Sequence, residues 1–153
     1  MASPARILLT GAGGFVGGHL RAAVAAAWPD AVVLAEPFEL RDSVAVEAAV
    51  AGGRPDACVH LAAVATPAAA REDEARAWDV NLHGTLRLAR AILLHAPECR
   101  LLFVSSADAY GGGAGAPVDE DAAPAVEPDT ATAVEPDTTP LSCGGKKPFG
   151  TMM

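Results

Sequence analysis

The sequence predicts an α/β fold with a doubly wound parallel sheet. Short apolar runs typical of strands alternate with stretches of helical spacing about five times between residues 6 and 105. The runs are apolar at nearly every position, which indicates strands covered by helices on both faces. Glycine, serine and acidic residues follow several of these runs. Ligands of such folds bind beyond the carboxyl ends of the strands, so we expect the functional site there.

The first half of the alternation begins with an apolar strand at 6–10. The glycines of 11–14 predict a turn, because glycine inside a strand or helix is costly. Helical spacing of apolar residues follows over 15–27. A second buried strand is predicted at 31–36 and a short third one at 38–40.

The second half repeats the pattern with one long helix. Asp42 or Ser43 is expected to cap a helix over 44–51. The remaining predicted elements are a strand at 57–62, a helix over roughly 72–96 and a strand at 100–105. Cys58 and Cys99 are expected to be small core residues.

Composition divides the chain of 153 residues near residue 111. Residues 1–110 hold nine Arg, no Lys and twelve acids, whereas 111–153 hold two Lys, no Arg, seven acids and six of the twelve prolines. The hexapeptide AVEPDT occurs twice in that last part, at 125–130 and 133–138. Such a segment buries too little apolar area to offset its ordering entropy. We therefore predict a folded domain over 1–121 and a disordered or frame-shifted tail over 122–153.

Several function classes are excluded by composition. A formal charge of −8 argues against nucleic acid as a partner. No apolar run approaches the roughly 20 residues of a membrane helix, and there is no signal-peptide pattern. Three widely spaced cysteines and four scattered histidines form no disulfide framework and no metal-ligand pattern. We expect a soluble, cytoplasmic protein without a metal.

A glycine-rich loop is the strongest single motif. Gly11, Gly14 and Gly17 are spaced three apart between a predicted strand and helix, the context of a dinucleotide-binding loop. The helix N-terminus offers N–H groups and partial positive charge to phosphates. Glu36 ends the second predicted strand, where a carboxylate can bind the ribose diol and repel a 2′-phosphate. This favours NAD as cofactor, with NADP as the alternative, and leaves Glu39 or Asp42 as competitors for the ribose.

Four blocks in order make the chain resemble the extended short-chain dehydrogenases/reductases, the epimerase/dehydratase group that acts on nucleotide sugars. The blocks are TGAGGFVG at 10–17, HLAA at 60–63, VNLHGT at 80–85 and FVSSADAYG at 103–111. The resemblance implies a Rossmann-type sheet, a nucleotide-sugar substrate and members that are often homodimers. It also implies the following cofactor contacts: Phe15 and Val16 at the pyrophosphate, Glu39 and Leu40 near the adenine, and Leu61, Ala62 and Ala63 beside the nicotinamide.

The resemblance assigns the catalytic hydroxyl to Ser106. In the family this residue hydrogen-bonds the reacting sugar oxygen beside a Tyr-x-x-x-Lys pair, in which the tyrosine is the general acid/base. The phrase SADAY at 106–110 resembles epimerases and 4-keto-sugar reductases. Dehydratases usually carry an acidic pair after the hydroxyl residue, and Ala107 replaces the first acid here.

The tyrosine–lysine pair cannot be found. Tyr110 is the only tyrosine, Ala114 follows four residues later, and the only lysines are Lys146 and Lys147. Family members are also about twice as long. We therefore expect the NAD(P)-binding portion of an epimerase or 4-keto-sugar reductase, truncated and inactive as this chain. A change of reading frame or an artificial truncation would explain the C-terminal segment. The alternative is a natural short protein with its own tail. The alternative function is a non-catalytic dinucleotide-binding or sensor protein.

Overall fold

A computed structural model of the chain describes residues 5–110, 119, 121 and 122. These residues belong to two compact units that divide between Val104 and Ser105. Every strand and α-helix described below lies in the first unit. The predicted tail lies outside the described residues, apart from Ala122.

Four parallel strands form the sheet, as the continuous apolar runs predict. They are β1 (Arg6–Thr10), β2 (Val32–Leu34), β3 (Ala57–His60) and β4 (Arg100–Phe103). Their order is β2-β1-β3-β4, so the chain leaves β1 first toward one edge and later toward the other. The predicted α/β fold is confirmed. The carboxyl ends of β1 and its two neighbours therefore meet at a switch point, where doubly wound sheets bind ligands.

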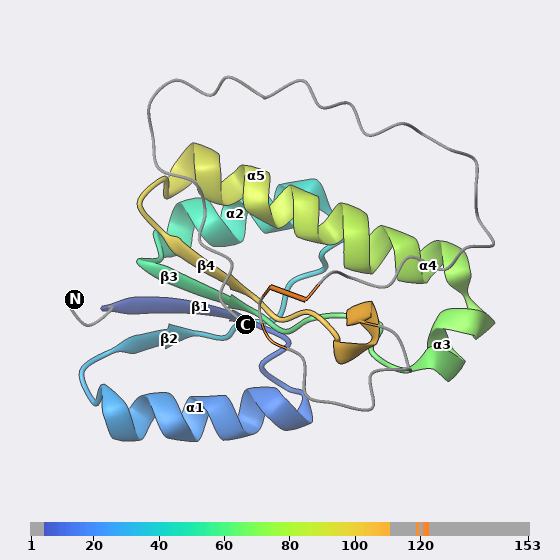
Figure 1. Cartoon of the computed structure of the whole chain (residues 1–153). Coiled ribbons are helices and arrows are strands. Elements are labelled where there is room, and N and C mark those ends of the chain that lie inside the picture. The colour runs from blue at the N-terminus through green and yellow to red at the C-terminus, as the bar shows by residue number, and fades with distance from the viewer. Residues whose placement is uncertain (1–4, 111–118, 120, 123–153) are drawn as a thin grey trace. The chain divides into compact units, whose positions relative to one another are not determined.

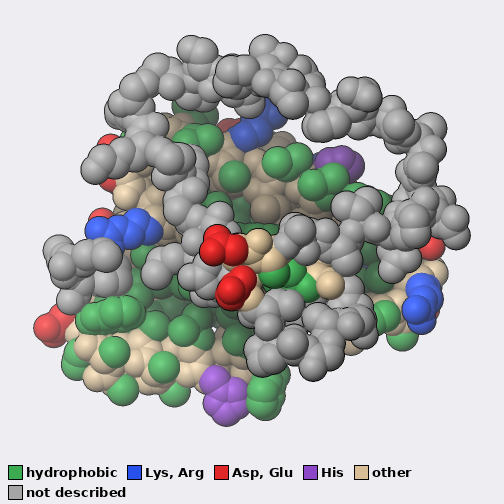
Figure 2. Space-filling model, viewed as in Figure 1, with side chains coloured by type: hydrophobic (Ala, Val, Ile, Leu, Met, Phe, Trp, Pro, Cys, Tyr) green, Lys and Arg blue, Asp and Glu red, His purple; other side chains and the backbone are tan. Residues whose placement is uncertain are grey.

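Helices cover both faces of this sheet (Figure 1). Helix α1 (Phe15–Ala27) lies on one face, and α2 (Ser43–Gly53) lies with α5 (Thr85–His95) on the other. Hydrophobic side chains remain visible over the surface of α1 (Figure 2). Helix α2 begins at the expected cap, because the Asp42 carboxylate accepts the amide hydrogens of Val44 and Ala45 at 2.9 and 3.2 Å.

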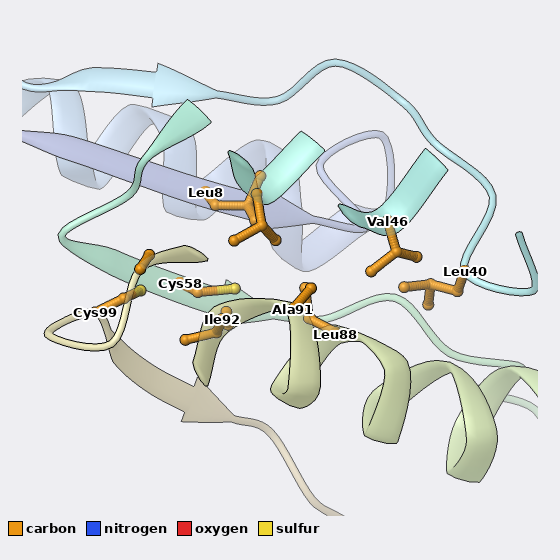
Figure 3. Packing of buried hydrophobic residues seen from close by; sticks show 10 residues of the cluster. Leu8, Leu40, Val46, Cys58, Leu88, Ala91, Ile92 and Cys99 are labelled. Carbon is orange, nitrogen blue, oxygen red and sulfur yellow. The ribbon is translucent and has the colours of Figure 1, made fainter. Parts of the chain in front are cut away.

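The main hydrophobic core fills the layer between the sheet, α2 and α5 (Figure 3). Cys58 is fully buried there and Cys99 is buried at its margin, which confirms both as core residues. The other buried members come from every element of this layer: Leu8, Leu40, Val46, Val50, Leu88, Ala91, Ile92 and Ala96. The core thus fixes the ends of β1 and β3 relative to α5.

Two element predictions are wrong. Residues 38–40 form no strand, and β2 ends at Leu34. The alternation of Phe38 and Leu40 imitates a strand, but Pro37 offers no N–H for a ladder and Leu40 instead turns into the core. The segment from Ala35 to Leu40 is therefore a loop that crosses the carboxyl edge of the sheet.

In place of one long helix over 72–96, the structure has four consecutive helical pieces, the first of which begins before the predicted start. They are α3 (Pro67–Glu72), α4 (Glu74–Trp78), a π-helix (Asp79–Gly84) and α5. Thr66 caps α3 earlier than expected and Pro67 occupies its first position. Asp73 then ends α3 and caps α4 by accepting the amide hydrogen of Arg76 at 2.9 Å. The apolar spacing predicts one continuous helix, but polar side chains that accept backbone amide hydrogens end one helix and begin the next.

Candidate dinucleotide-binding site

A cleft of about 260 Å³ opens at the carboxyl ends of β1 and β2. It lies between the glycine turn and the loop that follows β2. Its lining residues are Leu9, Thr10, Gly11, Ala12, Gly13, Ala35, Glu36, Pro37, Phe38, Leu40 and Ala62. The structure thus gathers the predicted residues Gly11, Glu36, Leu40 and Ala62 around one space.

The glycine turn is packed too closely for side chains at two of the three predicted positions. Gly11 has a φ of 71°, and a Cβ there would lie 2.8 Å from the Ala62 nitrogen. A Cβ on Gly17 would lie 2.5 Å from the carbonyl oxygen of Gly11. Gly14 closes the turn by donating its N–H to that oxygen at 3.0 Å. The glycines thus bring α1 and residues 61–62 against the end of β1.

The first turn of α1 keeps its amide hydrogens open. No side chain among the described residues caps this helix at Gly14, and its first turn holds no acidic residue. By contrast, the N-termini of α2, α3 and α4 are each capped by a side chain. Phe15 and Val16 are exposed, at 83% and 57%. An uncapped helix N-terminus suits an anion such as a pyrophosphate, which can accept hydrogen bonds from the first amides of the helix.

Two predicted acidic residues of the loop after β2 have different surroundings. Among the described residues that line the cleft, Glu36 carries the only charged side chain. Glu39 instead pairs with Arg41 at 3.3 Å, and hydrogen bonds from Arg41 lower the pKa of the Glu39 carboxyl. Of these two candidates for the ribose, Glu36 is the one that lines the cleft, whereas Glu39 is paired with Arg41.

Leu40 is held from the side of the π-helix. It is buried, and a Cβ on Gly84 would lie 2.9 Å from the Leu40 Cβ. The Arg87 guanidinium donates to the Leu40 carbonyl oxygen at 3.4 Å and to the Asp79 carboxylate at 2.9 Å. This ion pair lowers the pKa of Asp79. Helix α5 therefore fixes the end of the loop that carries Glu36.

The predicted residues 61–63 continue from β3 along the cleft. The Leu61 amide donates to the Thr10 carbonyl oxygen at 3.3 Å, and Ala62 lines the cleft. Ala63 is exposed. One residue further, Asn81 holds Val64 by two hydrogen bonds, accepting its N–H at 2.8 Å and donating to its carbonyl oxygen at 3.2 Å.

A buried side-chain series beneath the cleft was not predicted from the sequence. The His60 Nδ1 lies 2.6 Å from the Thr10 hydroxyl, and its Nε2 lies 3.0 Å from the Thr85 hydroxyl. The Thr10 hydroxyl oxygen also accepts the Ala62 amide hydrogen at 3.2 Å. His60 is 2% exposed, and this burial lowers its pKa. Thr10 and His60 each end an apolar run, but no local sequence pattern pairs them with each other or with Thr85.

Ser106 belongs to the second unit. It precedes a 3-10 helix (Ala107–Tyr110), and the Ala109 amide donates to its carbonyl oxygen at 3.1 Å. Lys146 and Lys147 lie outside the described residues. The catalytic role of Ser106 therefore stays a prediction.

The described part of the chain holds neither a candidate membrane span nor a candidate metal-ligand cluster. No helix in this part is long and apolar enough to cross a membrane. No group of three or more His, Cys, Asp or Glu residues in the same part could hold a metal ion.

Comparison with known proteins agrees with this geometry. The chain is 37% identical over 129 residues to the GDP-6-deoxy-D-mannose reductase of Pseudomonas aeruginosa, across 78% of this chain. It spans only 40% of the length of that relative. A solved structure of RMD from Pseudomonas aeruginosa with NADPH is 31% identical with a TM-score of 0.67, covering 80% of this chain and 42% of that one.

A second solved structure and a family model complete the comparison. The UDP-glucose 4-epimerase of Thermus thermophilus in complex with NAD is 28% identical with a TM-score of 0.69, covering 78% of this chain and 44% of that one. The family model described as "NAD dependent epimerase/dehydratase family" matches residues 7–133. The match covers most of the chain and includes both the glycine turn and the cleft. The chain therefore belongs to the NAD-dependent epimerase/dehydratase family.

Proposed function

We propose that this chain is the NAD(H)-binding portion of an enzyme that transfers hydride at a carbon of a nucleotide-linked sugar. One observation carries the proposal: the cleft at the switch point of the sheet is lined by the glycine turn, and this turn leads directly into the uncapped N-terminus of α1. These groups fit a dinucleotide, because glycines admit the pyrophosphate closely and the open amides bind its oxygens. When bound, the nicotinamide supplies the hydride chemistry.

The cleft favours NAD(H) over NADP(H). Its only charged lining residue among those described is Glu36, whose carboxylate can accept hydrogen bonds from the ribose diol. The same carboxylate repels a 2′-phosphate. Arg41, the nearest basic residue along the loop, is already paired with Glu39. Relatives use either cofactor, since the structures compared above contain NADPH in one case and NAD in the other.

The substrate and reaction class come from the relatives and from the phrase around Ser106. The curated relative is a GDP-sugar reductase, and the Thermus thermophilus neighbour is a UDP-sugar epimerase. We propose an epimerase or 4-keto-sugar reductase in which Ser106 would hydrogen-bond the reacting sugar oxygen. Because the sequence offers no Tyr-x-x-x-Lys pair, this chain binds the cofactor without turnover.

Calorimetry with NADH and NADPH tests the cofactor assignment. Two unit charges about 4 Å apart in water repel by about 1 kcal/mol, or about fivefold in affinity. We therefore expect the chain to bind NADH about fivefold more tightly than NADPH, and Glu36→Gln to remove this preference. Glu39→Gln is the matched control and should retain it. Loss of the preference in the control but not in Glu36→Gln would assign the ribose to Glu39.

A non-catalytic dinucleotide-binding or sensor protein is the second candidate. The missing tyrosine–lysine pair favours it, because binding does not need that pair. An assay of NADH absorbance with a nucleotide-linked 4-keto sugar tests both candidates. Turnover at ordinary enzymic rates by this chain would refute our claim that the pair is required. Absence of dinucleotide binding would refute both candidates.

A further inference from the structure

His60 lies in the middle of the carboxyl edge of the sheet. It ends β3 and is in register with Thr10 on β1 and with Phe103 on β4. Its ring contacts side chains on two different elements, Thr10 at the end of β1 and Thr85 at the start of α5. The residues that follow these strand ends, Gly11 and Ala62, line the cleft. His60 is thus the point where the supports of the cleft meet.

The hydrogens of the two hydroxyls determine which ring nitrogen of His60 carries the proton. The Thr85 hydroxyl donates to the Asn81 carbonyl oxygen at 2.6 Å, and a carbonyl can only accept. The single hydrogen of Thr85 is therefore used, and its oxygen must accept from His60 Nε2–H. In the neutral ring Nδ1 is then an acceptor, and it accepts the hydrogen of the Thr10 hydroxyl.

The resulting hydrogen bonds all run in one direction. The Ala62 amide donates to Thr10, Thr10 to His60, His60 to Thr85, and Thr85 to the Asn81 carbonyl. Each hydroxyl and each ring nitrogen then has a partner, as buried polar groups require. A protonated ring would leave the hydrogen of buried Thr10 without this acceptor.

We propose that neutral His60, protonated on Nε2, is a positioning residue of the dinucleotide site. It acts by orienting the hydroxyls of Thr10 and Thr85. This rests on the proposed function. Through Thr10 it fixes Ala62 against the glycine turn, and through Thr85 and Asn81 it reaches the segment that ends at Val64. The burial that lowers the pKa of His60 supports the neutral form.

Histidine NMR of the full chain, without cofactor, tests the ring itself. Isotope-labelled histidine distinguishes a bare Nδ1 with a protonated Nε2 from the opposite tautomer. His60→Phe identifies the His60 signals by their loss. We expect the Nε2–H form at neutral pH and its loss in Thr85→Val, which removes the acceptor. An Nδ1–H ring or a charged ring in the wild type would overturn the proposal.

Calorimetry with NADH tests the consequence for the cleft. His60→Phe keeps an aromatic ring but removes both hydrogen bonds, so we expect about tenfold weaker binding by a chain that still melts cooperatively. His60→Asn retains a group near the Nδ1 position and should recover part of the affinity. His95→Phe is the matched control, since His95 ends α5 at the opposite end of that helix from Thr85.

The outcomes separate the two proposals. A wild-type chain that binds neither NADH nor NADPH refutes the proposed function, and the positioning role with it. A wild-type chain that binds NADH, together with unchanged affinity in folded His60→Phe, refutes the positioning role alone. If His60→Phe is unfolded, Thr85→Val gives the decision, because it removes only the two hydrogen bonds of the hydroxyl, with His60 and with the Asn81 carbonyl, and changes little volume. Unchanged affinity in that variant likewise refutes the role.

Discussion

Replacing each of two adjacent glycines by alanine tests how the glycine turn is built. At Gly17 a Cβ would lie 2.5 Å from the Gly11 oxygen and 2.7 Å from the Ala12 Cα, both backbone atoms. The first distance is about 0.9 Å short of ordinary contact, so α1 must move. At Gly18 a Cβ would have no heavy atom of the described residues within 4 Å, apart from its chain neighbours and the backbone of its own helix. The two positions share one helix, but Gly17 is buried against the glycine turn whereas Gly18 is exposed.

The expected changes in the free energy of unfolding have opposite signs. Alanine is favoured over glycine inside a helix by about 1 kcal/mol, so Gly18→Ala should stabilise the chain by up to about that amount. Overpacking costs about 1–3 kcal/mol, and the helix preference of alanine offsets about 1 kcal/mol of this cost. Gly17→Ala should therefore lower the free energy of unfolding by about 1 kcal/mol.

Urea unfolding measures both free energies, and an unchanged slope shows that only stability differs. Calorimetry with NADH should show weaker binding for Gly17→Ala alone, because the displaced helix moves its amides away from the glycine turn. If Gly17→Ala is as stable as Gly18→Ala, the close approach of α1 to Gly11 is wrong, and the geometry of the cleft with it.

Three further predictions concern stability and reactivity. Asp42→Ala removes the cap of α2 and should lower the free energy of unfolding by about 1 kcal/mol in urea, whereas an unchanged midpoint would contradict the cap. Burial raises the pKa of Cys58 to about 12 and of Cys99 to about 11, so iodoacetamide at about pH 8 should label these two residues only after unfolding; rapid labelling of Cys58 or Cys99 in the native chain, located by peptide mapping, would contradict their burial. Burial lowers the pKa of His60 below its usual 6.5, so below about that pH the unfolded chain binds a proton that the folded chain does not. The free energy of unfolding should therefore fall as the pH drops through this window and level off below the folded pKa, and His60→Phe should remove that loss; an equal loss in the variant would assign it to other groups.

The sheet could be predicted because its signals are local. Each strand is a continuous apolar run, and the glycines after Thr10 mark where the first one ends. The third predicted strand failed for a local reason too. Phe38 and Leu40 have the spacing of a strand, but Pro37 precedes them and the core takes Leu40. The same apolar spacing is therefore found in a loop whose Leu40 side chain packs into the core.

The support of the cleft could not be predicted because it is not local. Thr10, His60 and Thr85 are separated by 50 and 25 positions; the parallel register of β1 and β3 brings the first two together, and the placement of α5 brings Thr85 to them. A buried histidine at the end of a strand has no sequence pattern that reveals its partners. The glycines, in contrast, were predicted because their spacing reflects contacts within one strand, turn and helix.

The π-helix is the feature that joins these separate supports. Its turn carries Asn81, whose side chain holds Val64, and Gly84, which leaves room for Leu40. Thr85 follows directly and accepts from the histidine of β3. The loop after β2, the end of β3 and the segment after it are thus all held from one stretch of five residues. The apolar spacing of this segment predicts a regular α-helix and does not reveal the π turn. Such turns are often found at functional sites. The irregular turn therefore belongs to the construction of the cleft, because it brings to one place the groups that contact Leu40 in the cleft wall and His60 and Val64 on either side of the lining residue Ala62.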